Sequence, residues 1–310
     1  MEKNVSIIIL NWNGLEDTIK CIESLKKITY EDYKIIVVDN ASEGNDVEEL
    51  KSRFNDYIYV IKNDRNYGYA EGNNIGIKFA LESGTDYILI LNNDIVVDPY
   101  FLNALIEVSE TETNVGIASP KTYYLSKPDT LFSVGGKLNV YLGQHKMIGT
   151  NQKDSGKFDS IQEFDFVAGA CMLIQKQVIE KVGLIPTEYF LQWEDIDYCY
   201  QMRKNGFRCL YVPKAKIWHK VGASFDRHKQ NYVAVMRGIK NRFIFSNKNL
   251  TKFQLPIFLI LFSSVTMPTY ILYYLLYYRD IKRIFYFYKG YFQGLKYTAN
   301  KLLLSKPIYS

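Results

Sequence analysis

The sequence predicts an α/β protein whose core is a doubly wound, mostly parallel sheet. Short apolar runs alternate along the first half of the chain with segments of helical periodicity. One apolar run, 88–91, has no polar alternation and stops at Asn92, Asn93 and Asp94. Such runs suit strands covered by helices on both faces, and open sheets of this kind bind ligands at the carboxyl ends of their strands.

The composition fits a globular protein of one large or two fused domains. Of 310 residues, 47% are hydrophobic and 23% charged, which allows a large core. The net charge of +5 is concentrated near the C-terminus, where seven lysines and arginines after residue 278 face only Asp280. The remaining chain is near neutral, so nothing indicates nucleic-acid binding. Four cysteines without metal-ligand spacing, and a first apolar run too short for a signal peptide, indicate a reduced, cytosolic setting.

The N-terminal segments alternate between strand and helix. In order, the patterns predict a strand at 5–10, a helix at 17–27, a strand at 33–38, a helix at 46–54 and a strand at 57–61. Asn11 and Asn13 lie in the loop after the first strand, and Asp39 follows the second. The β-α-β-α-β order places these loops at the ligand edge of the sheet.

Three glycines spaced four apart, Gly68, Gly72 and Gly76, mark the next helical segment. Their spacing differs from the G-x-G-x-x-G of dinucleotide sites. On a helix they form one stripe, which favours close packing against a neighbour over a phosphate cradle. Asn66 and Asn73 are harder to explain by packing, because amides are weak helix formers unless they bind something.

The polar triplet at 92–94 has two interpretations. It can be a turn before a second short strand. A carboxylate and two amides can instead hold a divalent cation through their oxygens, and that cation can hold a diphosphate. A helix at 100–110 and a strand at 115–120 follow.

The second half of the chain is less regular. Residues 121–164 are polar and contain glycine, with a turn between short antiparallel strands expected at 133–136. The apolar segment 166–174 predicts a buried strand that includes Gly169 and Ala170, where a glycine marks either the approach of a ligand or a bulge. A helix at 176–182 and a strand at 209–212 are also expected.

Acidic residues gather at a predicted helix start after Trp193. Glu194, Asp195 and Asp197 suit the positive end of a helix dipole, so a solvated capping cluster is one interpretation. Trp193 favours another, because large aromatic side chains beside acids commonly form a wall for a sugar ring. His219, one of three histidines, is a structural residue unless the fold brings it to Asp94.

Seven segments in this order resemble the family 2 glycosyltransferases of the GT-A fold, in particular the non-processive rhamnosyltransferase and galactofuranosyltransferase-like branch. They are V-S-I-I-I-L-N-W-N-G, I-I-V-V-D-N-A-S, N-Y-G-Y-A-E-G-N-N-I-G, L-I-L-N-N-D, V-A-G-A-C-M-L-I, W-E-D-I-D and W-H, which cover roughly residues 4–225. The resemblance implies a nucleotide-sugar donor such as dTDP-rhamnose or a UDP-sugar, a glycan or lipid-linked acceptor, and Mg²⁺ or Mn²⁺. It also implies transfer with inversion in polysaccharide biosynthesis. Because the Q-x-x-R-W motif of processive synthases is absent, it implies transfer of one sugar per encounter.

The resemblance assigns roles by position in the family's motifs. The nucleotide contacts would be Asn11, Asn13 and Asp39, and the residues along the donor Asn66, Asn73, Asn92 and Asn93. The metal ligands would be Asp94 and His219. The catalytic base would be Asp195 with Glu194 beside it, and the acceptor and sugar side would be lined by Trp193, Gly169 and Ala170. Asn92 stands where the family has the first carboxylate of D-x-D, so we expect weaker metal binding.

An uncharged run of about 24 residues, 255–278, is long enough to span a bilayer as a helix. Basic residues flank it on both sides, and a single span would carry one flank across. We therefore expect a re-entrant or interface-lying helical pair, broken near Pro268, on the cytosolic leaflet, with the basic tail on anionic lipid. A true span, and burial of the run against the domain, are the alternatives.

These patterns predict a GT-A domain at 1–240 and a membrane-associated helical tail at 241–310. Within the domain, 1–114 would bind the nucleotide-sugar and 115–240 the acceptor. Two other functions stay open. A sugar-phosphate nucleotidyltransferase shares the start of the fold, but it carries a glycine-rich phosphate loop where this chain has N-W-N-G at 11–14. A membrane-anchored sugar-binding protein without turnover would explain Asn92.

Overall fold

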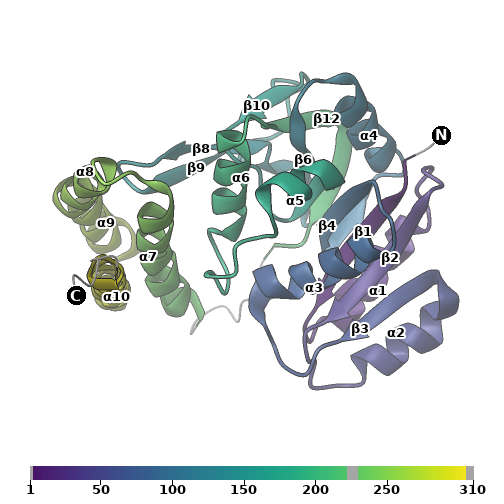
Figure 1. Ribbon diagram of the computed structural model, residues 1–310, viewed down its shortest axis with the longest axis horizontal. Coiled ribbons are helices and arrows are strands. Elements are labelled where there is room, and N and C mark those ends of the chain that lie inside the picture. The colour runs from purple at the N-terminus through teal and green to yellow at the C-terminus, as the bar shows by residue number, and fades with distance from the viewer. Residues whose placement is uncertain (1–2, 222–229, 305–310) are drawn as a thin grey trace, which may run out of the picture. The chain divides into compact units, whose positions relative to one another are not determined.

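The computed structural model describes residues 3–221 and 230–304, which belong to two compact units (Figure 1). The first unit comprises Met1–Lys137, Met147–Phe190 and Glu194–Ser224, and the second comprises Leu138–Lys146, Leu191–Trp193 and Phe225–Ser310. The second unit therefore includes two short segments that precede the predicted tail by many residues. Each unit has its own hydrophobic core.

A mixed sheet with a parallel half forms the centre of the first unit. Its strands are β1 (Val5–Asn11), β2 (Tyr33–Asp39), β3 (Ile58–Lys62), β4 (Tyr87–Asn92), β5 (Ile95–Val97), β6 (Val115–Tyr124), β7 (Lys127–Ser133), β10 (Gln162–Phe164), β11 (Cys171–Gln175) and β12 (Arg208–His219). The order is β10-β12-β6-β11-β4-β1-β2-β3, with β5 paired to β12 and β7 to β6. The pairs β3/β2, β2/β1, β1/β4 and β6/β12 are parallel, whereas β11 runs antiparallel between β4 and β6. This arrangement confirms the predicted fold class.

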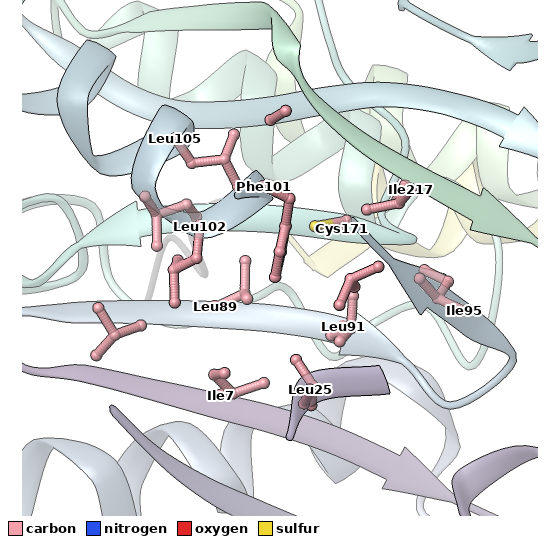
Figure 2. Packing of buried hydrophobic residues seen from close by; sticks show 14 of the residues in the cluster. Ile7, Leu25, Leu89, Leu91, Ile95, Phe101, Leu102, Leu105, Cys171 and Ile217 are labelled. Atoms are coloured by element: carbon pink, nitrogen blue, oxygen red, sulfur yellow. The ribbon is translucent and has the colours of Figure 1, made fainter. Parts of the chain in front are cut away.

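Helices cover both faces of the sheet, as the unbroken apolar run of β4 predicted. They are α1 (Leu15–Leu25), α2 (Asp46–Phe54), α3 (Gly68–Glu82), α4 (Phe101–Thr111), α5 (Lys176–Val182) and α6 (Glu194–Lys204), with a 3-10 turn at Asn55–Tyr57. Figure 2 shows Leu89 and Leu91 of β4 packed beneath Phe101 of α4. All three side chains are almost fully buried, so the hydrophobic effect fixes the strand that ends at the polar triplet.

The glycine stripe of α3 packs against the opposite face of the same sheet. A Cβ atom on Gly76 would lie 2.6 Å from a methyl carbon of Ile8, and one on Gly72 would lie 2.6 Å from a methyl carbon of Leu10. Only glycine allows the helix backbone this close to β1. The packing interpretation of the stripe is therefore confirmed for these two positions.

Two predictions for the second half of the chain were wrong. Much of 121–164 forms short strands, although 149–161 contains none of the named ones. The turn expected at 133–136 does not join two paired strands, because β7 pairs with β6 while β8 (Gly135–Asn139) pairs with β9 (Gln144–Ile148). The strand predicted at 166–174 begins only at Cys171. Gly169 and Ala170 form a turn before it, because the backbone of Gly169 bonds to side chains instead of a neighbouring strand.

The second unit consists mainly of helices. They are α7 (Gln230–Asn249), α8 (Gln254–Leu261), a π-helical turn at Phe262–Thr266, α9 (Met267–Tyr273), a second π-helical turn at Tyr274–Tyr278, and α10 (Ile281–Leu304). Aromatic rings dominate its core, among them Phe243, Phe258, Phe262 and Phe287.

The apolar run forms one helix, Gln254–Tyr278, that is long and apolar enough to cross a membrane by length and composition. The break predicted at Pro268 was wrong. Proline removes an N–H donor and crowds the carbonyl one turn before it, and here the wider π-helical turn that ends at Thr266 accommodates both effects without interrupting the helix. Only 17% of the most apolar window is buried, which disfavours burial of the run against the domain.

Candidate active site

The carboxyl ends of β1, β2 and β4 bring the first predicted site residues together. Asn11 is the register partner of Asp39, and Asn92 is the partner of Leu10, so the three polar side chains follow neighbouring strands at one edge of the sheet. The prediction that the polar strand ends converge is therefore confirmed.

Asn11 and Asp39 are fully buried and hold two loops against each other. The Asn11 amide donates to Asp39 Oδ2 over 2.8 Å and to Asp46 Oδ2 over 2.9 Å, while the Thr18 hydroxyl donates to Asn11 Oδ1 over 2.8 Å. Ser42 donates to Asp39 through its backbone N–H and its hydroxyl. These side chains lie beneath the loops that follow β1 and β2. Sequence reasoning missed the part of Ser42, although a serine three residues after an aspartate at a strand end is a common turn signal.

Asn13 and Asn40 order the loops at the same edge. Asn13 takes a left-handed backbone conformation with φ of 50°, and its side-chain oxygen accepts the N–H of Glu43 over 2.8 Å. Asn40, which the sequence analysis did not single out, donates to Asn66 Oδ1 over 2.9 Å. Asn66 in turn accepts the N–H of Gly68 at the start of α3. The loops before α2 and α3 are thus tied by amides.

Asn73 is the one predicted donor residue of α3 with an unused buried acceptor. Its amide donates to the carbonyl of Tyr69 over 2.9 Å, while its Oδ1 atom has no hydrogen-bond partner in the described part of the chain. Neighbouring Asn74 bonds both backbone groups of Ile185, which explains that amide structurally. A buried acceptor without a donor is costly, so the Asn73 oxygen suits a ligand's hydroxyl or N–H.

The fold brings His219 to Asp94. Asp94 lies in the turn between β4 and β5, and β5 pairs antiparallel with β12 so that Ile95 faces His219. His219 Nε2 lies 3.0 Å from Asp94 Oδ1, and the two side chains are 9% and 8% exposed. The turn interpretation of the triplet is therefore correct, and the site interpretation stays a prediction. Asn93 turns inward and donates to the Thr18 hydroxyl over 3.0 Å, so it stabilises the turn.

The pair fits a divalent cation that is shared with a phosphate ligand. The residues described hold no group of three or more His, Cys, Asp or Glu side chains that could bind a metal by themselves. Mg²⁺ sites that use one or two protein ligands and complete their shell with phosphate oxygens and water are common. His219 Nδ1 is buried with no hydrogen-bond partner among residues 3–221 and 230–304, and an edge-on contact with Phe132 at 5.2 Å orients the ring. Asn92, half-buried at the same turn, offers an amide oxygen.

Asp195 is held at the start of α6 by two backbone donors. Its Oδ2 atom accepts the N–H of Gly169 over 3.0 Å, and its Oδ1 atom accepts the N–H of Ile196 over 2.8 Å. Burial raises the pKa of this carboxyl, and the two backbone bonds oppose that rise. Glu194 and Asp197 in the same turn are buried, which excludes a solvated capping cluster.

The turn at 169–170 links Asp195 to the end of β4. A Cβ atom on Gly169 would lie 3.2 Å from Asp195 Cβ and 3.3 Å from the Tyr69 hydroxyl, so glycine keeps this approach open. The Ala170 carbonyl accepts the N–H of Asn92 over 2.9 Å. Asp195 and the Asp94–His219 pair are therefore attached to the same end of one strand.

The family model described as "Glycosyltransferase like family 2" matches residues 3–238. The chain belongs to this family. The low-salt glycan biosynthesis hexosyltransferase Agl10 of Haloferax volcanii is 26% identical over 253 residues, which cover 81% of this chain and 78% of the relative. The dTDP-rhamnosyl transferase RfbF of Shigella flexneri is 24% identical over 283 residues, or 86% and 87% of the two chains.

This glycosyltransferase shares its fold with a solved mannosyltransferase from Pyrobaculum calidifontis in complex with GDP-Man and Mn²⁺. The TM-score is 0.58 at 12% identity. The similarity covers 95% of this chain and 88% of the mannosyltransferase. At this identity the likeness shows the fold alone, and it confirms the predicted GT-A architecture.

The prediction that Trp193 forms a sugar wall in this glycosyltransferase is contradicted by its burial. Trp193 is 3% exposed and belongs to the second unit, where its ring packs edge-on against His145, with ring centres 5.2 Å apart, and at a tilt against Phe245, with ring centres 5.4 Å apart. A ring enclosed in this way offers no open face to a sugar. Its left-handed backbone, with φ of 79°, turns the side chain of Trp193 into the core, and local sequence gives no signal of that turn.

Tyr69 is a candidate positioning residue that the sequence analysis missed. Its hydroxyl donates to the Gly169 carbonyl over 2.6 Å, while the Gly169 N–H donates to Asp195. Burial, and next the charges of Glu194 and Asp195, raise the pKa of Tyr69, so the hydroxyl stays protonated as a donor. The backbone of one residue, Gly169, thus joins Tyr69 to the candidate base.

Replacing Tyr69 with phenylalanine should lower kcat by about two- to tenfold, the equivalent of one neutral hydrogen bond. Loosening Gly169 weakens a bond that favours the charged form of Asp195, so the pKa of Asp195 should rise and the acidic limb of the pH–rate profile should move to higher pH. Tyr67→Phe, which removes the hydroxyl that donates to Asp64, is the matched control. An unmoved acidic limb in Tyr69→Phe would show that Tyr69 is merely structural.

Proposed function

We propose that this family 2 glycosyltransferase inverts the configuration of one sugar as it transfers the sugar from a nucleotide-diphosphate donor to a hydroxyl of a glycan or lipid-linked acceptor. The observation that carries the proposal is the attachment of a candidate cation pair, Asp94–His219, and a candidate base, Asp195, to the same end of β4. A glycosyl transfer needs both, since one group must stabilise the departing diphosphate and another must remove the acceptor proton.

Asp195 is suited to the role of general base. Its backbone bonds to Gly169 and Ile196 fix the carboxylate, and its raised pKa makes the ionised form a stronger proton acceptor than an ordinary aspartate. Asp195 takes the proton of the acceptor hydroxyl, whose oxygen attacks the anomeric carbon from the face opposite the nucleotide. Attack opposite to departure inverts that carbon.

Residues around the end of β4 would stabilise the departing nucleotide diphosphate. Asp94 and His219 would hold a divalent cation, with the Asn92 oxygen beside them, and that cation would neutralise charge on the departing diphosphate. Asn13 and Asn66 are the candidates for direct donor contacts on the loops, whereas Asn11 and Asp39 support them from below. The Asn73 oxygen, which has no partner among the described residues, can accept a hydrogen bond from the donor. The name of the Shigella relative favours a dTDP-sugar over other donors.

A thermal-shift screen tests the proposal. Purified protein is heated with nucleoside diphosphates and nucleotide-sugars, with and without Mn²⁺ or Mg²⁺. A ligand at a hundred times its dissociation constant adds about 2.7 kcal/mol to the free energy of unfolding, which is easily measured. We expect stabilisation by one nucleotide only in the presence of metal. No stabilisation by any nucleotide would leave a sugar-binding protein without turnover as the better explanation of Asn92.

In this proposal the enzyme sits at the cytosolic face of a membrane, and the apolar helix Gln254–Tyr278 is its candidate anchor. Basic residues on both flanks favour a helix that lies in the interface. Several large apolar side chains on and beside the helix are exposed, including Leu276 and Ile281.

Cysteine labelling distinguishes an interface-lying helix from a span. The four native cysteines are free and buried, so exposed Lys252→Cys and Lys282→Cys variants can be labelled selectively. An impermeant maleimide added to inside-out vesicles should label both positions. Labelling of only one of the two would establish a true span.

A further inference from the structure

An arginine in the second unit is buried with donors that have no partner among the described residues. Arg242 of α7 is 7% exposed, and its Nη2 atom donates to the Tyr270 hydroxyl over 2.9 Å. Its Nε and Nη1 atoms are buried and have no hydrogen-bond partner in the described chain. A guanidinium is always charged and has five N–H donors, so most of its bonding capacity is unused here.

Aromatic rings enclose this guanidinium without satisfying it. Its carbon lies 4.8 Å from the ring centre of Tyr270 and 5.9 Å from those of Trp193 and Phe262. These contacts offset part of the cost of burying the charge, but the rings supply no in-plane acceptor for the orphaned donors. Burial, and next the charge of Arg242, lower the pKa of His145 to about 4, so this neighbour is neutral near pH 7 and adds no second cation.

The second unit provides no anion for Arg242 within its described residues. In 230–304 the sequence has eleven lysines and arginines and one acid, Asp280. Asp280 is already engaged, since its Oδ2 atom lies 3.3 Å from Arg283 Nε and accepts the Tyr232 hydroxyl over 3.1 Å. A buried charge without a counter-charge is unfavourable, so an anion from outside the unit would be bound favourably.

A second unused polar group lies one turn along the same helix. Ser246 is fully buried, and its hydroxyl has no hydrogen-bond partner in the ranges described. Residues four apart lie on one face of a helix, so Arg242 and Ser246 face the same side of α7. A planar fork of donors with a hydroxyl one turn away suits a tetrahedral oxyanion, for which arginine is the preferred bidentate partner.

We propose that Arg242 and Ser246 form a binding site for the phosphoryl group of a lipid. The aromatic surroundings and the exposed apolar residues of the same unit favour a lipid over free phosphate, because they suit the apolar chain that follows the headgroup. The phosphoryl group can belong to an anionic phospholipid of the bilayer or to the diphosphate of a polyprenyl-linked acceptor. The second source rests on the proposed function, whereas the first does not.

The test compares Arg242→Met, which keeps the length but removes the charge, with Lys240→Met on the same helix, which makes the same change in net charge. Full-length protein is titrated with farnesyl diphosphate, with farnesol, and with vesicles of phosphatidylglycerol or phosphatidylcholine. We expect affinity for one phosphorylated probe to fall about 10- to 100-fold in Arg242→Met alone, the loss of a charge-assisted pair. Without ligand, the Tm of Arg242→Met should be unchanged or higher, since an unpaired buried charge is removed.

The two phosphorylated probes distinguish the acceptor diphosphate from the bilayer headgroup as the ligand. A selective loss of farnesyl diphosphate binding identifies the acceptor diphosphate, and a selective loss of phosphatidylglycerol vesicle binding identifies the bilayer headgroup. Wild-type affinity of Arg242→Met for both probes overturns the site. If Arg242→Met does not fold, Arg242→Lys and Ser246→Ala replace it, and wild-type binding by both overturns the proposal equally. Nucleotide-induced stabilisation, measured on the same samples, reports separately on the donor site.

Discussion

Asp195→Asn is expected to lower kcat by about 10²- to 10⁴-fold, the range that a positioned general base contributes. Asparagine has nearly the same shape and can still accept the N–H of Gly169 or of Ile196, so the turn should persist. It cannot take a proton from the acceptor. Because Asp195 does not hold the nucleotide in the proposed reaction, donor affinity should stay close to that of the wild type.

The control for this substitution is Asp197→Asn. Asp197 is a buried carboxylate in the same helical turn, and its Oδ1 atom accepts from Gln201 over 3.0 Å, a bond that asparagine can keep. Initial rates and isothermal titration with nucleotide-sugar would be measured for both variants. Equal losses of kcat in the two variants would mean that any change in this turn disables the enzyme and that Asp195 has no special role.

The pH dependence of the wild type gives an independent measurement. A base must be ionised, so activity should rise with pH as Asp195 loses its proton. Because burial raises the pKa of Asp195, the acidic limb of kcat/KM should lie above the value near 4 that is usual for an aspartate. In Asp195→Asn that limb should be absent from the residual rate. Loss of nucleotide-sugar hydrolysis in the same variant would exclude a binding protein without turnover.

The sheet was predictable because its signals are local. An apolar run such as that of β4 predicts a strand without information from the rest of the chain. The β-α-β alternation then predicts parallel pairing of that strand with its neighbour. The turn before β11 was not predictable, because the chain there leaves the ladder for bonds to Tyr69 and Asp195, which are 100 and 26 residues away. The continuous helix through Pro268 was missed for a related reason, since a π-helical turn leaves no mark in the spacing of apolar residues.

The site residues also divide into those that the sequence indicated and those that depend on contacts between distant parts of the chain. Asp94 and His219 were paired in advance only through the resemblance to a family, and the pairing of β5 with β12 explains why they meet. Trp193 was misjudged because a residue's neighbours in sequence do not reveal a left-handed backbone that turns its ring into a different unit. Tyr69 and Asn40 act through hydrogen bonds to residues distant in the chain, and composition and periodicity carry no information on such bonds.

Asp94→Ala is expected to lower kcat/KM by about 10²- to 10³-fold, because a bound cation contributes several kcal/mol and each ~1.4 kcal/mol is a factor of ten. Alanine removes the only carboxylate of the pair and leaves His219 without its partner at 3.0 Å. The metal requirement of nucleotide binding should disappear with it. Titration of Mn²⁺ by electron paramagnetic resonance, with nucleoside diphosphate present, measures that loss directly and independently of turnover.

The reverse change at the same turn makes the test sharper. Asn92→Asp adds a carboxylate at the end of β4, in the position where the family carries its first D-x-D acid. A second negative charge near a divalent cation should lower the Mn²⁺ concentration needed for half-maximal activity by roughly an order of magnitude. The two substitutions therefore move one quantity, the affinity for Mn²⁺, in opposite directions. If Asn92→Asp leaves that affinity unchanged while Asp94→Ala abolishes activity, Asp94 acts by holding His219 and the turn, and the cation is bound elsewhere.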